Sequence, residues 1–125
     1  MMGIRITLNQ KAIAKLGDAI LKSADLTMES LKTDVFSEEV MPFNVGTMQN
    51  TNTFVDTYQN GDKICSSLVT TGPQPRRLYH HPEYNFQTVN NHNAQGYWLE
   101  SWIDGRKKDF VRDAYAENLK READL

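Results

Sequence analysis

The sequence predicts an α+β fold in which a small antiparallel sheet, built on one β-hairpin, packs against a long N-terminal helix and C-terminal helices. Two patterns support this. Apolar residues recur every three or four positions through residues 9–36, which is the periodicity of an amphipathic helix. Two runs rich in β-branched and aromatic residues then flank the turn dipeptide Asn60-Gly61, which favours a hairpin. A length of 125 residues suits one domain, so we expect a single α+β domain over residues 1–125.

The predicted helix over residues 9–36 has one apolar stripe and a suitable N-cap, Asn9. A helix of this kind is expected to cover one face of a sheet. The stripe consists of Ile13, Leu16, Ile20, Ala24, Met28, Leu31 and Val35.

Residues 50–81 are predicted to form the hairpin and one more short strand, the latter over residues 76–81 before Pro82. Successive side chains of a strand point to opposite faces, so a tight turn fixes which residues share a face. One face is expected to hold Thr53, Val55, Thr57, Ile64, Ser66 and Leu68, and the other Phe54, Tyr58, Cys65 and Val69.

Beyond the hairpin we expect a loop over residues 82–93 and helices over residues 94–123. The loop segment has several asparagines and little periodicity, and a long irregular loop in a compact domain usually has a function. We expect residues 72–93 to be mobile or to become ordered on a partner. Asp104 is predicted to cap the last helix, with the apolar stripe Phe110, Val111, Ala114, Tyr115 and Leu119.

The charge and cysteine content limit the possible functions. A formal net charge of -2 gives no overall attraction to nucleic acid or to an anionic membrane. Cys65 is the only cysteine, which excludes an internal disulfide and a zinc site built on several cysteines. No apolar run suits a signal peptide or a membrane span, so we expect a cytoplasmic protein without membrane contact.

His80, His81, Glu83 and His92 are the one group of residues typical of a metal or acid-base site. Adjacent histidines on a strand point to opposite faces, and Pro82 prevents a helical register that would bring them together. We therefore predict no metal site. No nucleophile elbow, phosphate-binding loop or dinucleotide motif is present, so we predict no catalytic residue and no cofactor.

Basic and aromatic residues alternate in the segment that holds Arg76, Arg77, Tyr79, Tyr84 and Phe86. Such a pattern suits single-stranded nucleic acid, through phosphate contacts and base stacking, and it equally suits a protein interface. Because the overall charge is slightly acidic, a protein partner is the expectation and nucleic-acid contact is not.

Several short motifs occur in an order that resembles a known family. Residues 41–51 place Pro, a small polar residue, Gly and an aliphatic residue before the first strand. After the hairpin come Leu78-Tyr79, Pro82-Glu83-Tyr84-Asn85-Phe86, Asn93-Ala94 ahead of Trp98, and Lys108-Asp109-Phe110. Over residues 40–122 this order is similar to the minor capsid and tail-completion proteins of long-tailed phages and prophages of Gram-positive bacteria.

The chain departs from the family pattern at two positions. Met48 stands where Leu is commoner, and Thr51 where Ser is commoner. Residues 1–39 match only in length and amphipathicity.

The resemblance implies a structural subunit of the phage neck, made in the host cytoplasm and then part of the virion. It implies a ring of copies, sixfold or twelvefold, between the head-closure proteins and the tail terminator, built from subunits that are often monomeric in isolation. It implies no cofactor and no enzymatic activity. Two alternatives stay open: a small enzyme or toxin-like module that uses His80, His81 or His92, and a module that binds single-stranded nucleic acid. The expected interface residues are Pro42, Asn44, Gly46, Met48, Arg76, Arg77, Tyr79, His80, His81, Tyr84 and Phe86.

Overall fold

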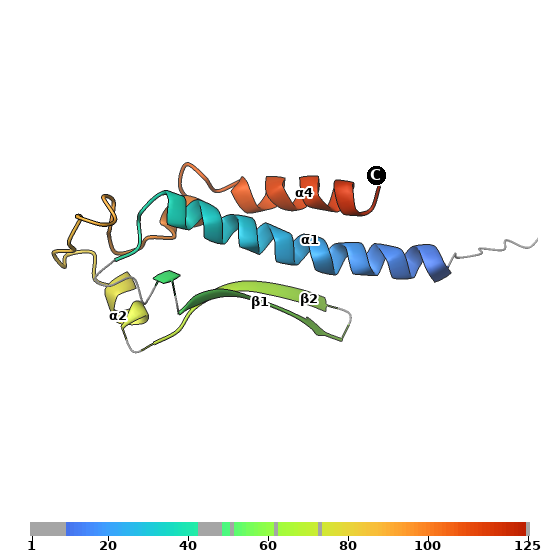
Figure 1. The fold of residues 1–125 in the computed structure, drawn as a ribbon, viewed down its shortest axis with the longest axis horizontal. Helices are drawn as coiled ribbons and strands as arrows, with labels where there is room; N and C mark the ends of the chain where they lie inside the picture. The colour runs from blue at the N-terminus through green and yellow to red at the C-terminus, as the bar shows by residue number, and fades with distance from the viewer. Residues whose placement is uncertain (1–9, 43–48, 51, 62, 73, 125) are drawn as a thin grey trace, which may run out of the picture.

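The computed structural model describes residues 10–42, 49–50, 52–61, 63–72 and 74–124. They form an α+β fold with three layers, in which one long helix lies between a β-hairpin and a C-terminal helix (Figure 1). This confirms the predicted fold class. Short helices and an irregular segment gather at one end of the long helix, where the hydrophobic core also lies.

The first helix, α1, spans Gln10–Ser37, which confirms the helix predicted over residues 9–36. Its proposed cap, Asn9, lies outside the described residues. The predicted apolar stripe is buried only in the C-terminal half, at Leu31 and Val35, whereas Ile13 and Leu16 are 46% and 44% exposed. The reason is geometric: the N-terminal end of α1 extends beyond both the hairpin and the C-terminal helix (Figure 1).

The core joins the end of α1 to residues far along the chain. Buried Leu31 and Val35 pack with Val40 and Met41, which follow α1, and with two tryptophans, Trp98 and Trp102. Burial of large apolar side chains is the main favourable term in folding, so this cluster is the part of the fold on which the other elements depend.

The hairpin consists of β1, Thr53–Asn60, and β2, Lys63–Thr70, paired antiparallel. Thr57 lies opposite Ser66 and Tyr58 opposite Cys65, so both predicted faces are confirmed. The turn lies one residue later than expected, because Asn60 is the last residue of β1 and pairs with Lys63. A two-residue turn at Asn60-Gly61 would pair Gln59 with residue 62, whereas Gln59 pairs with Ile64, two positions later. An even shift of this kind leaves each side chain on its predicted face.

The predicted short strand over residues 76–81 is wrong. This segment contains the helix α2, Pro75–Tyr79. Proline at the first helical position fixes a φ that suits a helix and lacks an N–H that the helix would leave unpaired. The N–H of Leu78 donates to the carbonyl of Gln74 at 2.9 Å, which closes the first turn.

The helices predicted over residues 94–123 exist but are shorter. α3 spans Glu100–Ile103 and α4 spans Phe110–Glu122, with Asp109 in place of Asp104 at its N-cap. Between them the chain makes a tight turn in which the N–H of Lys107 donates to the carbonyl of Ser101 at 2.8 Å. A Cβ on Gly105 would lie 2.7 Å from the Cα of Ser101, so this turn requires glycine there.

α4 packs along α1 through small and polar side chains as well as apolar ones. Asn118, in the middle of α4, is buried, and its amide donates to the Thr27 hydroxyl of α1 at 3.2 Å. Thr27 in turn donates to the carbonyl of Ser23 at 2.7 Å. Buried polar groups need such partners, and this pair fixes the register of α4 on α1.

Candidate interaction surface

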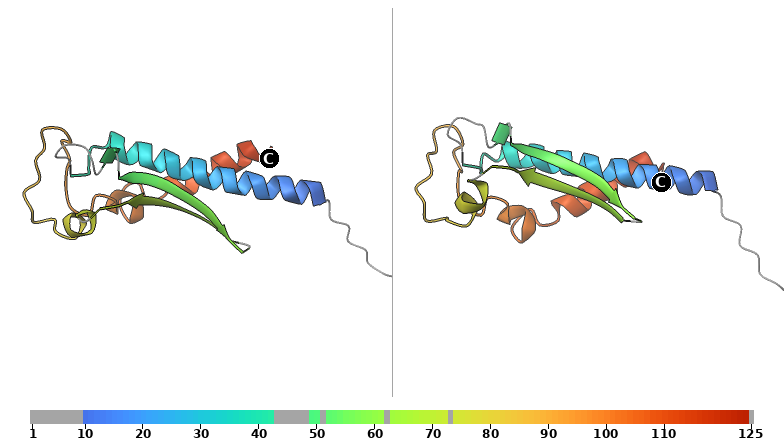
Figure 2. Two further views of the ribbon diagram at one scale, coloured as in Figure 1. Left: turned by 60° about the horizontal axis from the view of Figure 1, so that its bottom comes forward. Right: turned by 90° about the horizontal axis from the view of Figure 1, so that it is seen from below.

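The hairpin has an inner face that is covered by α1 and an outer face that no described helix covers (Figure 2). On the inner face the hydroxyl of Thr57 donates to Asp25 Oδ1 of α1 at 2.7 Å. On the outer face Phe54 and Tyr58 are 42% and 48% exposed. Phe54 lies beside Val69 and Tyr58 beside Cys65, and Asp56 with Ser67 separates these two pairs. Exposed aromatic side chains on an uncovered sheet face are typical of interaction sites.

Cys65 belongs to this outer surface. It is partly exposed and lies opposite Tyr58. A hydrogen bond with the Cys65 thiol raises the pKa of the Tyr58 hydroxyl above its ordinary value. Tyr58 and Cys65 thus lie opposite each other on the outer face, toward the turn of the hairpin.

A second candidate surface, which we call the Tyr84 cluster, consists of Arg77, His81, Glu83, Tyr84 and Phe86. The His81 ring stacks on Tyr84, with centroids 4.7 Å apart and planes 8° apart. The guanidinium of Arg77 lies 5.7 Å from the centroid of the same ring. His81 Nδ1 lies 2.6 Å from Glu83 Oε1, and this hydrogen bond lowers the pKa of Glu83. The cluster is ordered by its own contacts.

Tyr79, one of the predicted interface residues, is partly buried and packs against the core. Its ring meets Trp98 edge to face, with centroids 4.8 Å apart, and also meets Tyr97 and His80. Burial, with a smaller contribution from Glu100, raises the pKa of the Tyr79 hydroxyl. His80 is exposed and lies edge-on to Tyr79, at the rim of this packing.

The irregular segment is attached to the rest of the fold at its C-terminal end. Asn91 is buried, and its amide donates to the carbonyl of Met41 at 2.9 Å and to Gln49 Oε1 at 2.8 Å. The N–H of Asn93 donates to the carbonyl of Glu39 at 3.1 Å. These contacts leave the outward part, around residues 85–90, as the exposed portion of the segment.

Two features of this segment were not evident from the sequence. Val89 is 82% exposed, which makes it the most exposed of the large apolar side chains in the described part of the chain. Gly96 lies against Pro82 so closely that an added Cβ would be 2.7 Å from the Pro82 Cα. Both features depend on how distant parts of the chain pack, and the pattern of polar and apolar residues in this segment does not predict either of them.

The predicted interface residues therefore divide into three groups. Arg76 and Arg77 are exposed on α2, and Tyr84 and Phe86 are partly exposed beside them. Tyr79 belongs to the core packing with His80 at its edge, whereas His81 belongs to the Tyr84 cluster. Pro42 is partly exposed after Met41, and Asn44, Gly46 and Met48 lie outside the described residues.

The histidines do not converge. His81 pairs with Glu83, while Nδ1 of His92 lies 3.0 Å from Glu39 Oε2 at the end of α1. Within the described ranges, no three His, Cys, Asp or Glu side chains are grouped so that they could hold a metal ion.

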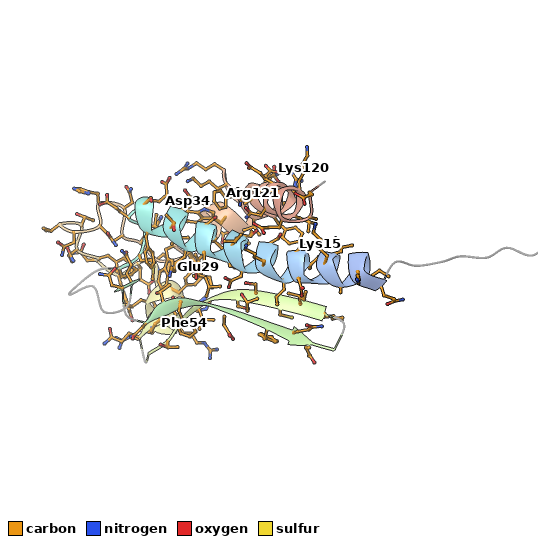
Figure 3. The ribbon with its side chains drawn as sticks, turned by 45° about the vertical axis from the view of Figure 1, so that its right-hand side comes forward. Lys15, Glu29, Asp34, Phe54, Lys120 and Arg121 are labelled. Carbon is orange, nitrogen blue, oxygen red and sulfur yellow. The ribbon has the colours of Figure 1, made fainter. Side chains whose placement is uncertain are left out.

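A shallow groove runs along α1 beside the start of α4, and Figure 3 labels two of its carboxylates, Glu29 and Asp34. The hydroxyls that line it donate back to helix carbonyls, as Ser30 does to Leu26 at 2.9 Å and Ser37 does to Thr33 at 2.8 Å. Its hydroxyls are thus used within α1, and Asp34 accepts hydrogen bonds from Lys107 and Trp102, so these groups already have partners within the fold. The groove is lined by Leu26, Glu29, Ser30, Thr33, Asp34, Ser37 and Phe110.

Comparisons with known protein families, with curated proteins and with solved structures each found no match. Among the described helices, none has both the length and the apolar character that a membrane span requires.

Proposed function

We propose that this chain is a structural subunit of the neck of a tailed phage, where copies of it form a ring that joins head and tail. The supporting observation is that two different exposed surfaces lie on one small fold: the outer hairpin face with Phe54 and Tyr58, and the Tyr84 cluster. A subunit that contacts neighbouring copies as well as head and tail proteins needs more than one contact surface, and aromatic and arginine side chains are enriched in such contacts. The order of motifs along residues 40–122 adds the family context.

In this proposal the neighbours are other copies of the chain, together with head-closure and tail-terminator proteins. The subunit is made in the host cytoplasm and ends in the virion neck. It acts without a cofactor or a catalytic residue.

The two alternatives have less support from the residue contacts. A single-strand binding module would use the faces of Tyr84 for base stacking, but His81 and Arg77 already occupy positions over that ring. A His-dependent enzyme would need a nucleophile or a substrate cavity beside its base, whereas His81 contacts Glu83 and Tyr84 on the surface.

The direct test is deletion of the coding sequence from the phage or prophage that carries it, followed by electron microscopy of induced lysates. We expect filled heads and separate tails, and complete particles again when the wild-type chain is supplied in trans. Complete infectious particles in the deletion lysate would refute the neck function.

A further inference from the structure

The hairpin edges form a surface that the proposed function leaves unassigned. In the described part of the chain the sheet has two strands, so residues 54–60 of β1 and 63–70 of β2 each have an edge with no partner strand. An open edge presents backbone N–H and C=O groups that can pair with another strand. Proteins block such edges with prolines or bulges, but neither strand contains a proline, and the pairing runs from Thr53–Thr70 to Asn60–Lys63 without a bulge.

Each strand carries one charged side chain, and the two charges are opposite. Asp56 is the charged residue of β1 and Lys63 that of β2, and both are exposed on the outer face. Within one hairpin they are four positions apart along the strands, about 13 Å at the usual rise per residue, so they are not neighbours. Across the open edges of two copies, however, they can meet.

We propose that β1 of one copy pairs antiparallel with β2 of a second copy, so that the sheet continues from subunit to subunit. This contact joins two unlike edges, so it can be repeated from copy to copy around a ring. The inference deepens the proposed function, and the location of the contact in a neck ring rests on that function. Within the hairpin Lys63 lies opposite Asn60. If the pairing between copies is shifted by two residues from this register, each side chain still points to the same face of the sheet. Lys63 then lies opposite Tyr58 of the next copy and diagonal to its Asp56, within reach of an ion pair.

The layers of the fold leave room for this arrangement. Two strands occupy about 9.5 Å across a sheet, and a helix with its side chains is about 10 Å wide. One α1 over each hairpin therefore lets the α1 helices of neighbouring copies lie side by side on the inner face. α4 does not interfere, because it packs on α1 on the side away from the hairpin (Figure 1).

The test uses reciprocal charge reversal in the full chain, with self-association measured by analytical ultracentrifugation and native mass spectrometry over a range of concentrations. We expect wild type to self-associate, and Asp56→Lys and Lys63→Asp alone each to associate at least tenfold more weakly, since each places like charges across the contact. An equimolar mixture of the two variants restores opposite charges at every contact and should associate as wild type does. Glu117→Lys, on the exposed surface of α4, is the matched control and should change nothing.

Three results would overturn the proposal: a wild-type chain that is monomeric at every concentration, single variants that associate as wild type does, or a mixture that stays as weak as its components. Unchanged circular dichroism and thermal midpoints establish that the variants fold. The outcome is separate from the deletion experiment. Charge-dependent association together with complete particles in the deletion lysate would support the sheet contact and refute the neck function. Charge-independent association together with separate heads and tails would refute the sheet contact and support the neck function.

Discussion

The Nζ atom of Lys107 donates a hydrogen bond of 2.8 Å to Asp34 Oδ2, which joins the turn before α4 to the C-terminal half of α1. The same ammonium donates to Glu38 Oε1 at 2.7 Å, and the indole of Trp102 donates to Asp34 Oδ2 at 2.8 Å. Arg106 adds an ion pair with Glu38 at 2.8 Å. This network connects residues about seventy positions apart in the sequence and positions α4 for its packing on α1.

Lys107→Ala should destabilise the fold by about 1–2 kcal/mol, because it removes two charge-assisted hydrogen bonds and leaves Asp34 with the Trp102 indole as its remaining donor. The measurement is the free energy of unfolding from urea denaturation. Lys108→Ala, at the exposed neighbouring position, is the control and should stay within about 0.5 kcal/mol of wild type. Equal losses in both variants would mean that the network contributes no net stability.

The same network predicts how stability depends on pH. Partial burial acts to raise the pKa of Asp34, but hydrogen bonds from Lys107 and Trp102 outweigh it, so the pKa lies below its ordinary value of 3.8. Hydrogen bonds from Lys107 and Arg106 likewise hold the pKa of Glu38 below 4.5. For a carboxyl group whose pKa is lowered by folding, the added stability is present above the unfolded-state pKa and is lost as the pH falls through the folded-state pKa.

We therefore expect Asp34 and Glu38 to leave the thermal midpoint unchanged between about pH 7 and about pH 5. At pH values below about 4 their protonation should lower the thermal midpoint. Thermal denaturation of wild type and of Lys107→Ala over this range is the measurement. The variant should lose less on acidification, because its carboxylates no longer have the lysine that lowers their pKa. Parallel curves for the two proteins would assign the acid sensitivity to other groups.

Local pattern was enough to predict α1 and the hairpin. Both depend on periodicity within a few residues, and the faces of the strands follow from alternation alone, which is why they survived a turn placed one residue too early. α2 was missed because Leu78 and Tyr79 suit a strand as well as a helix, and Pro75 decided between the two.

Other features depend on tertiary geometry. Ile13 and Leu16 have helical spacing, but only the structure shows that they stay nearly half exposed, unlike Leu31 and Val35. Asn118 has no place in an apolar stripe, and its burial follows from the hydrogen bond to Thr27, 91 residues away. The interface residues were predicted from composition, which does not show that Tyr79 packs on Trp98 whereas Tyr84 stacks on His81.

Gly96→Ala and Gly17→Ala should change stability in opposite directions. At Gly96 an added methyl group meets the Pro82 Cα at 2.7 Å, so the backbone has to shift, and we expect a loss of about 1–3 kcal/mol. At Gly17, within α1, a methyl group meets nothing within 4 Å, and alanine should stabilise the helix by about 1 kcal/mol. Chemical denaturation of both variants is the check. A Gly96→Ala protein as stable as wild type would show that residues 82 and 96 are not held in contact.

The last prediction concerns the Tyr84 cluster and the exposed Arg76, which precedes Arg77 on α2. Arg76→Ala together with Tyr84→Ala should leave the fold intact, with a change of about 1 kcal/mol or less, because both side chains lie outside the buried core. Heads and tails should nevertheless fail to join, since an anchor residue at an interface can contribute about 2 kcal/mol or more to binding. Urea denaturation measures the first effect, and electron microscopy of lysates that contain only the variant measures the second.

A core variant separates the two readouts. Leu31→Ala removes a buried side chain of the core and should destabilise the fold by about 2–5 kcal/mol. If the double variant unfolds as readily as Leu31→Ala, the Tyr84 cluster supports the fold, because the stack of His81 on Tyr84 then holds residues 81–86 against the rest of the chain. If it folds normally and still yields complete particles, the cluster is not a contact that joins head and tail, and the outer hairpin face around Phe54 and Tyr58 becomes the surface to mutate next.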